Sequence, residues 1–263
     1  MPVYAGTSGW QYRDWRGRFY PRKPAPDDDL AFYAARFQTV ELNATFYRLP
    51  EADTFAGWAK RVPGDFVFAM KASRFLTHVR RLRDPQEAVE RMMSRARRLG
   101  RKLGPVLLQL PPDMRRDGDR LRATLRAFPR RTRVAVEFRH PSWFDDAIRR
   151  LLEDHGAALC LADRGSRLIT PAWRTADWGY IRFHEGRSKD APCYGETALR
   201  SRAALVAATW GPSADVFVYF NNDAYACAVR DAALFARAAR RCRLDVSRTP
   251  DIAQPQIHLA GAI

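Results

Sequence analysis

Short apolar runs alternate with longer amphipathic segments along most of the chain. Apolar runs of this length between turn residues are typical of buried strands, and a 3.6-residue apolar period is typical of helices. The eight predicted strands are Val3–Thr7, Val40–Asn43, Phe66–Lys71, Val106–Leu110, Val134–Phe138, Ala158–Ala162, Gly179–His184 and Val216–Asn221. The predicted helices are Asp27–Arg36, Pro85–Leu99, Asp117–Phe128, Ser142–His155, Glu196–Thr209 and Tyr225–Arg241.

End signals support two of these helices, and one connection lacks them. Asp84 precedes a proline at the first helical position, and Ser142 is an expected N-cap. The stretch Leu168–Asp177 contains Pro171 and little periodicity. We therefore expect the helix between the sixth and seventh strands to be reduced or missing.

Strand–helix alternation repeated eight times over about 250 residues is the pattern of an α/β fold, the (β/α)8 TIM-like barrel. We expect one barrel over residues 1–243 and a non-helical tail over residues 244–263, packed on the barrel or trailing from it. A doubly wound open sheet is the alternative, but its G-x-G-x-x-G motif is absent.

The composition is that of a folded soluble protein, with 46% hydrophobic and 28% charged residues. No apolar run approaches the roughly 18–20 residues that cross a bilayer, and the N-terminus lacks a secretory pattern. We therefore expect a cytoplasmic protein with no membrane partner. Because Cys160, Cys193, Cys227 and Cys242 show no metal or redox spacing, we expect free thiols rather than disulfides.

The net charge of +16 changes the choice of partners. Forty of the 45 basic residues are Arg, a bias that a GC-rich coding sequence also produces. Whatever its origin, such a surface attracts polyanions such as nucleic acid. A solvated basic surface without a specific partner is the alternative.

Five predicted strands end in a polar–apolar–polar triplet. Because side chains alternate along a strand, we expect each polar pair to point into the barrel and each middle residue to point toward the helices. Barrel enzymes place their chemistry at this end. The triplets are Glu41-Leu42-Asn43, Lys71-Ala72-Ser73, Glu137-Phe138-Arg139, Arg182-Phe183-His184 and Tyr219-Phe220-Asn221. All three asparagines of the chain, Asn43, Asn221 and Asn222, lie at these ends, which strengthens the prediction of a site.

A stabilising ion-pair network is the alternative interpretation of these residues. Glu41 and Glu137 would then neutralise Lys71, Arg139 and Arg182. Each buried ion costs several kcal/mol unless it is paired, so a network kept for stability alone would be a poor replacement for Leu or Val. We therefore favour a functional site.

Longer motifs surround these positions. They are Gly6–Trp10 with Tyr12, Trp15 and Phe19–Pro21, then Glu41–Tyr47, Lys71–Arg74 with Thr77-His78, Gly104-Pro105, Gln109–Pro112, Glu137–Trp143, Arg182–His184 and Tyr219–Asn222. In these motifs the chain resembles the DUF72 family, also called YecE-like proteins, over nearly its whole length. The resemblance implies a TIM-like barrel and supplies no reaction. The chain departs from the family pattern at Glu185, where glycine is more usual, and at Asp223, where histidine is frequent.

Three kinds of chemistry fit the strand ends. Glu41 and Glu137 are candidates for general acid–base catalysis, with His184 as a candidate acid. Two carboxylates also suffice for glycoside hydrolysis, but neighbouring cations favour their ionised form, so we do not prefer that reaction. Together with Asp163 and His140 these residues supply metal-ligand types, but metal-binding spacing is lacking. No cofactor is clearly implied, and a divalent metal is the lesser alternative.

An anion site fits the residue types better. Lysine and arginine bind phosphate or carboxylate, and asparagine adds neutral donors. Aromatic residues near strand ends could stack on a ligand, whereas we expect Trp15, Phe19 and Tyr20 to pack as a lid. The candidate ligand-binding residues are Ser8, Trp10, Asn43, Tyr47, Lys71, Arg74, Arg139, His140, Trp143, Asp163, Arg182, Asn221 and Asn222.

The leading hypothesis is an enzyme that binds a phosphate-bearing ligand such as nucleic acid, and that would act as a hydrolase on it. One alternative is a non-catalytic nucleic-acid-binding or scaffold protein. Another is an enzyme acting on a small anionic metabolite or sugar, which predicts a pocket too narrow for a polymer.

Overall fold

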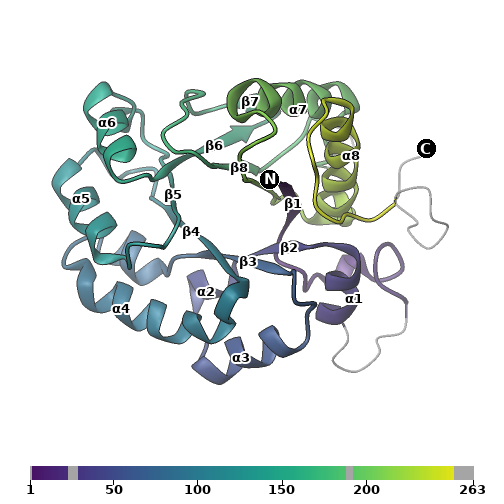
Figure 1. Ribbon diagram of the computed structural model, residues 1–263, viewed down its shortest axis with the longest axis horizontal. Helices are drawn as coiled ribbons and strands as arrows, with labels where there is room; N and C mark the ends of the chain where they lie inside the picture. Colours follow the sequence, from purple (N-terminus) through teal and green to yellow (C-terminus); the bar gives the residue numbers. More distant parts are fainter. Residues whose placement is uncertain (1, 23–28, 188–191, 252–263) are drawn as a thin grey trace.

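A computed structural model describes residues 2–22, 29–187 and 192–251 of the chain (Figure 1). Eight parallel strands form a barrel in the order β5-β4-β3-β2-β1-β9-β8-β6, which closes where β6 pairs with β5. The predicted (β/α)8 TIM-like barrel is confirmed. Its strands are β1 (Val3–Ser8), β2 (Thr39–Leu42), β3 (Val67–Lys71), β4 (Leu103–Gln109), β5 (Val134–Glu137), β6 (Ala158–Arg164), β8 (Gly179–Phe183) and β9 (Val216–Phe220).

Helices surround the barrel on its outer side (Figure 1). They are α1 (Asp29–Arg36), α2 (Ala44–Tyr47), α3 (Ala52–Lys60), α4 (Pro85–Ala96), α5 (Gly118–Ala127), α6 (Asp146–Asp154), α7 (Glu196–Trp210) and α8 (Cys227–Arg241). The sequence did not predict α2 and α3. Residues 27 and 28 of the first predicted helix lie outside the described residues.

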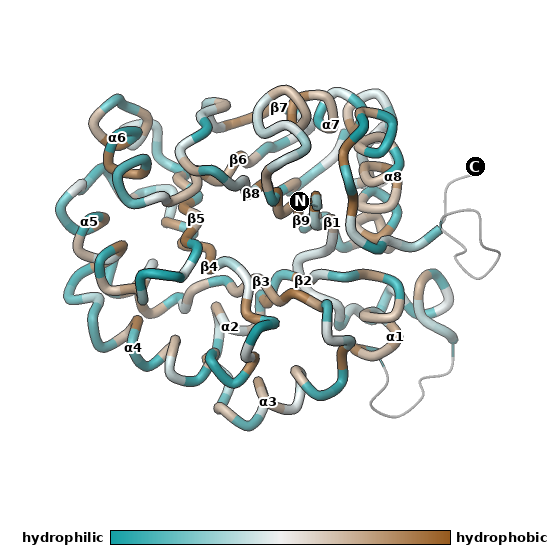
Figure 2. The backbone as a smooth tube through the Cα atoms, viewed as in Figure 1, coloured by the Kyte–Doolittle hydropathy of each residue, from teal (hydrophilic) through white to brown (hydrophobic). Residues whose placement is uncertain are grey.

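The apolar residues form two separate clusters. The larger cluster lies between strands and helices, and the smaller one includes Ala69, Leu107 and Tyr180 inside the barrel. Figure 2 shows the same arrangement along the backbone, with apolar stretches in the strands and hydrophilic stretches on the outer turns of the helices. The barrel interior is therefore a packed core below its mouth.

No helix connects β6 to β8, a segment that the structure describes throughout. In its place β7 (Arg167–Leu168) pairs antiparallel with the end of β6. Two threonines then satisfy the β6 backbone: the amides of Ala162 and Leu159 donate to the hydroxyl oxygens of Thr170 (3.1 Å) and Thr175 (2.8 Å). The expected loss of a helix here is confirmed.

Two predicted helix starts were wrong. Asp145, rather than Ser142, caps α6, because its carboxylate accepts the Ile148 amide at 2.8 Å. The hydroxyl of Ser142 instead accepts the amide of Arg116. Helix α8 begins at Cys227 rather than Tyr225, since Tyr225 has a left-handed φ of 59°.

The expectation of free thiols was wrong for one pair of cysteines. Cys193, just before α7, forms a disulfide with Cys227 at the start of α8, with a Cα–Cα distance of 4.9 Å. The two helices pack side by side, so the barrel topology brings these positions together without any sequence spacing to reveal it. Cys160 and Cys242 are free.

Residues 244–251 run along the start of β1. The Val3 amide donates to the Asp245 carbonyl at 2.8 Å, and the Ser247 amide donates to the Val3 carbonyl at 3.0 Å. The rest of the predicted tail, residues 252–263, lies outside the described residues. Among the described residues, no helix has the length and apolar character that a bilayer crossing requires.

Candidate functional site

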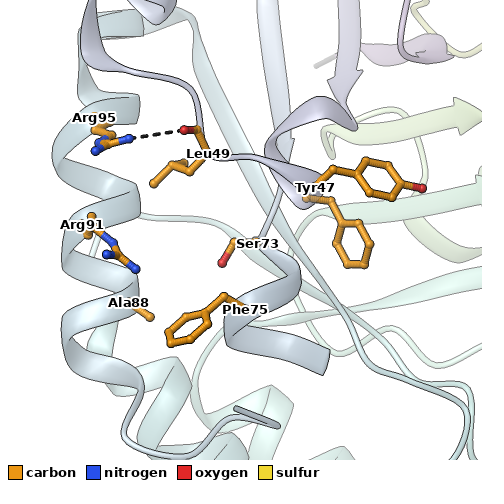
Figure 3. Close-up of a pocket in the computed structure, with 8 residues that line it drawn as sticks. Tyr47, Leu49, Ser73, Phe75, Ala88, Arg91 and Arg95 are labelled. Carbon is orange, nitrogen blue, oxygen red and sulfur yellow. Dashed lines mark hydrogen bonds between the residues drawn. The ribbon is translucent and has the colours of Figure 1, made fainter. Parts of the chain in front are cut away.

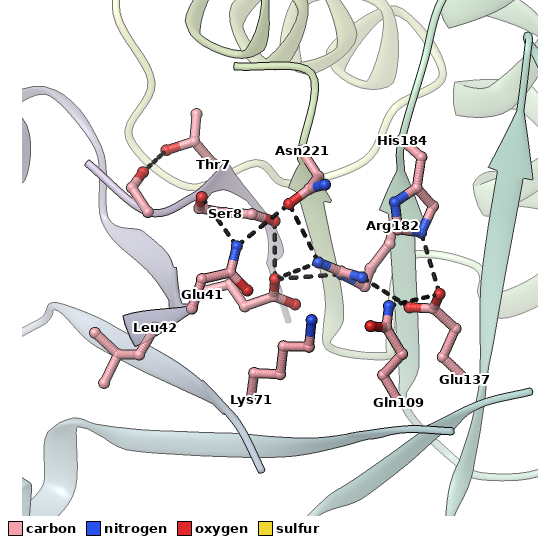
Figure 4. Close-up of polar contacts among 12 residues, drawn as sticks. Thr7, Ser8, Glu41, Leu42, Lys71, Gln109, Glu137, Arg182, His184 and Asn221 are labelled. Atoms are coloured by element: carbon pink, nitrogen blue, oxygen red, sulfur yellow. Dashed lines mark hydrogen bonds and ion pairs between the residues drawn. The ribbon is translucent and has the colours of Figure 1, made fainter. Parts of the chain in front are cut away.

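The strand-end triplets build a polar layer at the mouth of the barrel (Figure 4). Their middle residues, Leu42, Ala72, Phe138, Phe183 and Phe220, all belong to the helix-facing apolar cluster, as the alternation predicted. The polar residues come from seven strands and converge above the interior core: Ser8, Glu41, Lys71, Gln109, Glu137, Arg182 and Asn221.

Arg182 lies at the centre of this layer, with 1% of its side chain exposed. Its guanidinium donates to Glu41 Oε1 through Nη2 (2.9 Å) and Nε (3.2 Å), and to Glu137 Oε2 through Nη1 (2.8 Å). Burial by itself would lower the pKa of Arg182, but the two carboxylates outweigh it and raise that pKa well above its ordinary value. Arg182 is therefore a fixed cation that holds both carboxylates.

Each carboxylate has further donors. Glu41 accepts hydrogen bonds from the hydroxyls of Ser8 (2.8 Å) and Tyr180 (2.6 Å). Glu137 accepts from Gln109 Nε2 (2.8 Å), Arg139 Nε (3.2 Å) and His184 Nε2 (3.2 Å). Both glutamates are fully buried. We call these residues the Arg182 cluster: Ser8, Glu41, Gln109, Glu137, Arg139, Tyr180, Arg182 and His184.

The electrostatics of the cluster fix Glu137 in its ionised form. Burial works to raise the pKa of Glu137, but Arg182, His184 and Arg139 together hold it well below its usual range. A general acid needs a proton near neutral pH, and this carboxyl group does not keep one. The contacts of Glu41 and Glu137 are those of the ion-pair network that the sequence offered as the alternative interpretation.

Lys71 lies beside this cluster without joining it. Among the described residues its ammonium makes no hydrogen bond or ion pair, although Figure 4 shows it pointing toward the centre of the mouth. The ring of Phe46 lies 4.1 Å from Nζ, and 8% of the residue is exposed. Burial, followed by the charge of Arg182, lowers the pKa of Lys71 to about 8, against a smaller opposing effect of Glu41 and Glu137.

Several cations lie near His78. Burial, followed by the charges of Lys71, Arg139 and Arg74, lowers the pKa of His78 to about 4, so this imidazole is neutral. The ring of His78 packs against Phe46, with centroids 5.0 Å apart. Sequence reasoning placed His78 in a motif but gave it no role.

A cavity of about 530 Å³ opens beside the Arg182 cluster. Among its lining residues, Asp163, Asn222 and Asp223 each have a buried side-chain oxygen that accepts no hydrogen bond from the described residues. The full lining is Pro112, Glu137, Arg139, Asp163, Arg164, Ile169, His184, Glu185, Pro192, Asn221, Asn222, Asp223 and Ala224. We call it the mouth cavity.

Asp223 is the titratable group that sequence reasoning missed. Burial raises the pKa of its carboxyl to about 7, against the opposing effects of Tyr12 and Arg182. The sequence offered one signal, its departure from the family pattern, but no means of placing the side chain in the mouth cavity. Burial also raises the pKa of Asp163, against the hydrogen bonds that its Oδ1 accepts from the Tyr194 hydroxyl (2.6 Å) and the His184 amide (3.0 Å).

The structure does not bring all predicted ligand residues to the mouth. Trp143 is fully buried against Phe138, and its indole donates to the Met114 carbonyl. His140 orients a turn, since its Nδ1 accepts the Ser142 amide. These two residues have structural partners in place of a ligand.

Trp10, Tyr47 and Arg74 do not line the mouth cavity, and neither do Ser8, Asn43, Lys71 and Arg182. Trp10 is 5% exposed and packs edge-on against Trp58. Tyr47 is 79% exposed and borders a separate cavity of about 330 Å³ between α2 and α4, where its ring points away from the arginines of α4 (Figure 3). Trp15, Phe19 and Tyr20 are buried, as expected for packing residues.

The described residues contain no group of three or more His, Cys, Asp or Glu side chains arranged to hold a metal ion.

The side chains of Asn43 and Asn221 join the polar layer: Asn43 Nδ2 donates to Asn221 Oδ1 at 3.2 Å, and Asn221 also accepts from Arg182 at 3.3 Å. They extend the polar layer toward β1 and β9.

Comparisons with known proteins agree with this fold. A protein of Thermotoga maritima, whose solved structure is described as a DUF72 family protein, has a TM-score of 0.82 at 28% identity and covers 91% of this chain and 100% of its own. A DUF72 family protein of Enterococcus faecalis, at 18% identity and a TM-score of 0.77, shares the fold over 96% of this chain and 100% of its own.

Two curated relatives match more locally. UPF0759 protein YunF of Bacillus subtilis is 31% identical over 54% of this chain and 52% of its own length, and UPF0759 protein YecE of Escherichia coli is 29% identical over 54% and 50%. The match spans about half the length of each relative. The family profile described as "Protein of unknown function DUF72" matches residues 4–255. With a profile match over nearly its whole length, a shared barrel and the polar strand ends described above, the chain belongs to the DUF72 family.

Proposed function

We propose that the mouth of the barrel binds a small phosphate-bearing metabolite that also carries hydroxyl groups, such as a sugar phosphate. The observation that carries this proposal is Lys71. Its ammonium lies at a strand end without a counter-ion among the described residues, while Glu41 and Glu137 are bonded to Arg182. A buried charge without a partner is costly, and an incoming anion would offset that cost.

Arg139 provides a second contact for the anion. Among the described residues only its Nε is engaged, with Glu137, and its side chain is 30% exposed on the wall of the mouth cavity. A guanidinium can bind two oxygen atoms of a phosphate side by side. The cavity, at about 530 Å³, has the size of a small-molecule site, roughly 300–1,000 Å³.

Residues with hydrogen-bond acceptors line the same cavity as Arg139. Asp163, Asn222 and Asp223 each have a buried oxygen without a donor among the described residues. Buried acceptors are normally satisfied, so these oxygen atoms favour a ligand that brings hydroxyl groups. A phosphorylated polyol or sugar has both the anion and the hydroxyl groups.

Proton transfer in the mouth would fall to Asp223 rather than to Glu137. Catalytic acids and bases work best with a pKa near the working pH, and the pKa of Asp223 is about 7. The two glutamates instead position Arg182. An enzymatic role in the mouth would therefore belong to Asp223 on the cavity wall.

Calorimetric titration with sn-glycerol 3-phosphate tests the binding proposal. We expect saturable binding to the wild type and a loss of roughly 10- to 100-fold in affinity for Lys71→Met, since hydrogen bonds to charged groups contribute about 1.5–3 kcal/mol. Lys60→Met, at an exposed position of α3, is the matched control and should bind like the wild type. Equal affinity in wild type and Lys71→Met, or no binding by the wild type, would refute the proposal.

Nucleic acid is a second candidate, supported by the net charge of +16. A terminal phosphate could enter the same mouth while surface arginines contact the backbone. Fluorescence anisotropy of a labelled single strand should then show affinity that falls steeply with salt and that free glycerol 3-phosphate reduces. Undetectable binding at low ionic strength would exclude this candidate.

A further inference from the structure

Lys71 lies at the mouth of the barrel, near Glu137 and Arg139 of the mouth-cavity wall, although it does not itself line that cavity. It is the last residue of β3, inside the ring of strand ends that forms the mouth. Its Nζ contacts the face of Phe46 and is bonded to no oxygen atom of the described residues. Two other lysines lie in the part of the chain that the structure describes: Lys102 Nζ donates to the carbonyls of Ala59 (2.6 Å) and Val62 (2.7 Å), and Lys60 is exposed on α3.

We infer that Lys71 is a nucleophile that forms an imine with a small ketone or aldehyde carrying a phosphate group. This inference rests on the proposed function, because a phosphate held by Arg139 would bring the carbonyl to Lys71, which gives up its proton before it attacks. It adds a reaction and a narrower ligand class to that binding site.

The surroundings of Lys71 favour the neutral amine that such a reaction needs. Its pKa is lowered to about 8, first by burial and then by Arg182 on β8, with Arg139 acting in the same direction. Glu41 and Glu137 oppose the shift, and their charges are bonded to Arg182. At pH 7 roughly a tenth of the side chain is then neutral, about 300-fold more than for an ordinary lysine.

The reaction balances without an oxidant or a further reactant. The lone pair of Nζ attacks the carbonyl carbon, a C–N bond forms, and the carbonyl oxygen takes up a proton to give a carbinolamine. Loss of the hydroxyl as water, with transfer of the nitrogen proton, gives the imine. Water reverses each step, and the Nζ proton of the starting ammonium goes to solvent.

The ligand class follows from Lys71 together with the residues that line the mouth cavity. The phosphate is held by the cations of the mouth, in particular Arg139. Hydroxyl groups next to the carbonyl would face Asp163 and Asn222, whose buried oxygens lack donors among the described residues. A phosphorylated hydroxyketone meets all three requirements.

Reductive trapping tests the inference directly. The protein is incubated with dihydroxyacetone phosphate and sodium cyanoborohydride, which converts an imine into a stable secondary amine, and the adduct is mapped by mass spectrometry. The chain has five lysines, Lys23, Lys60, Lys71, Lys102 and Lys189, so the map is simple. We expect a single adduct at Lys71, formed faster as the pH rises through about 8.

Three variants and one ligand separate the outcomes. Lys60→Met should trap like the wild type, whereas Lys71→Met and Lys71→Arg should lose the adduct; Lys71→Arg keeps a cation and guards against a folding defect. Glycerol 3-phosphate has the same skeleton without a carbonyl, so it should slow trapping and form no adduct. If it binds and no adduct forms at Lys71, or adducts spread over all lysines alike, the imine is refuted and the binding proposal stands. If an adduct forms at Lys71 and glycerol 3-phosphate neither binds nor slows it, the imine stands and the binding proposal fails.

Discussion

The charged residues at the strand ends of the barrel mouth differ in whether they have a counter-ion. At the ends of β2, β5 and β8, Arg182 bonds both Glu41 and Glu137, so each of these charges has an opposite charge beside it. At the end of β3, Lys71 has an aromatic ring beside it and no counter-ion among the described residues. A polar group whose partners are all protein groups is explained by the fold, whereas one left without a partner is better explained by a ligand.

The largest expected effect comes from removing the centre of the Arg182 cluster. Arg182→Met leaves two buried carboxylates without their cation, and breaking a buried pair in this way costs about 3–5 kcal/mol of unfolding free energy. Urea unfolding followed by circular dichroism measures it. Arg200→Met removes an exposed i,i+4 pair with Glu196 and should change stability by less than about 1 kcal/mol. Similar losses in both variants would mean that the cluster does not stabilise the barrel.

Replacing the Glu137 carboxylate should give the next largest loss of stability, and that loss should depend on pH. Because the pKa of Glu137 is lower in the folded state, the unfolded chain binds more protons, and the stability from this group is lost as the pH falls below about 4.5. Glu137→Gln should therefore cost about 2–3 kcal/mol at pH 7 and progressively less toward pH 3. A constant difference across this range would contradict the assignment.

Asp223 should behave in the opposite sense. Its pKa rises from 3.8 to about 7 on folding, so the folded state holds the proton more tightly and loses stability as the pH rises from about 4 to 7. Asp223→Asn should then be more stable than the wild type by about 1–2 kcal/mol at pH 8, a figure reduced for its partial exposure, with no gain at pH 4. A variant that is less stable at pH 8 would place Asp223 among the structural groups.

Replacing Lys71 should have the smallest effect on the free energy of unfolding, and it should raise that free energy where replacing Arg182 lowers it. Its pKa is lower in the folded state, so stability rises as the pH increases from about 8 to 10.5. Lys71→Met removes that cost and should gain about 1 kcal/mol at pH 7, less above pH 10. Urea unfolding of Lys71→Met and Arg182→Met under the same conditions measures both changes. If Lys71→Met loses as much stability as Arg182→Met, the two residues do not differ in the way described.

The sequence was sufficient to predict the barrel and the inward direction of Glu41, Glu137 and Arg182, because both depend on local period. It could not show that Arg182 bonds both glutamates while Lys71 bonds neither. Those pairings depend on barrel closure, which sets residues from distant strands within 3 Å of one another. The burial of Asp223 and the Cys193–Cys227 disulfide were hidden for the same reason.

The titration of Lys71 itself tests the central claim most directly. In protein with 13C-labelled lysine, the Cε resonances of the five lysines report each pKa, and Lys71→Arg assigns the one of interest. We predict that one resonance titrates near pH 8, is missing in the variant, and moves to higher pH when glycerol 3-phosphate binds, since an anion stabilises the ammonium. If all five lysines titrate near 10.5 with and without the ligand, Lys71 is not a buried ammonium without a counter-ion, and the claim is contradicted.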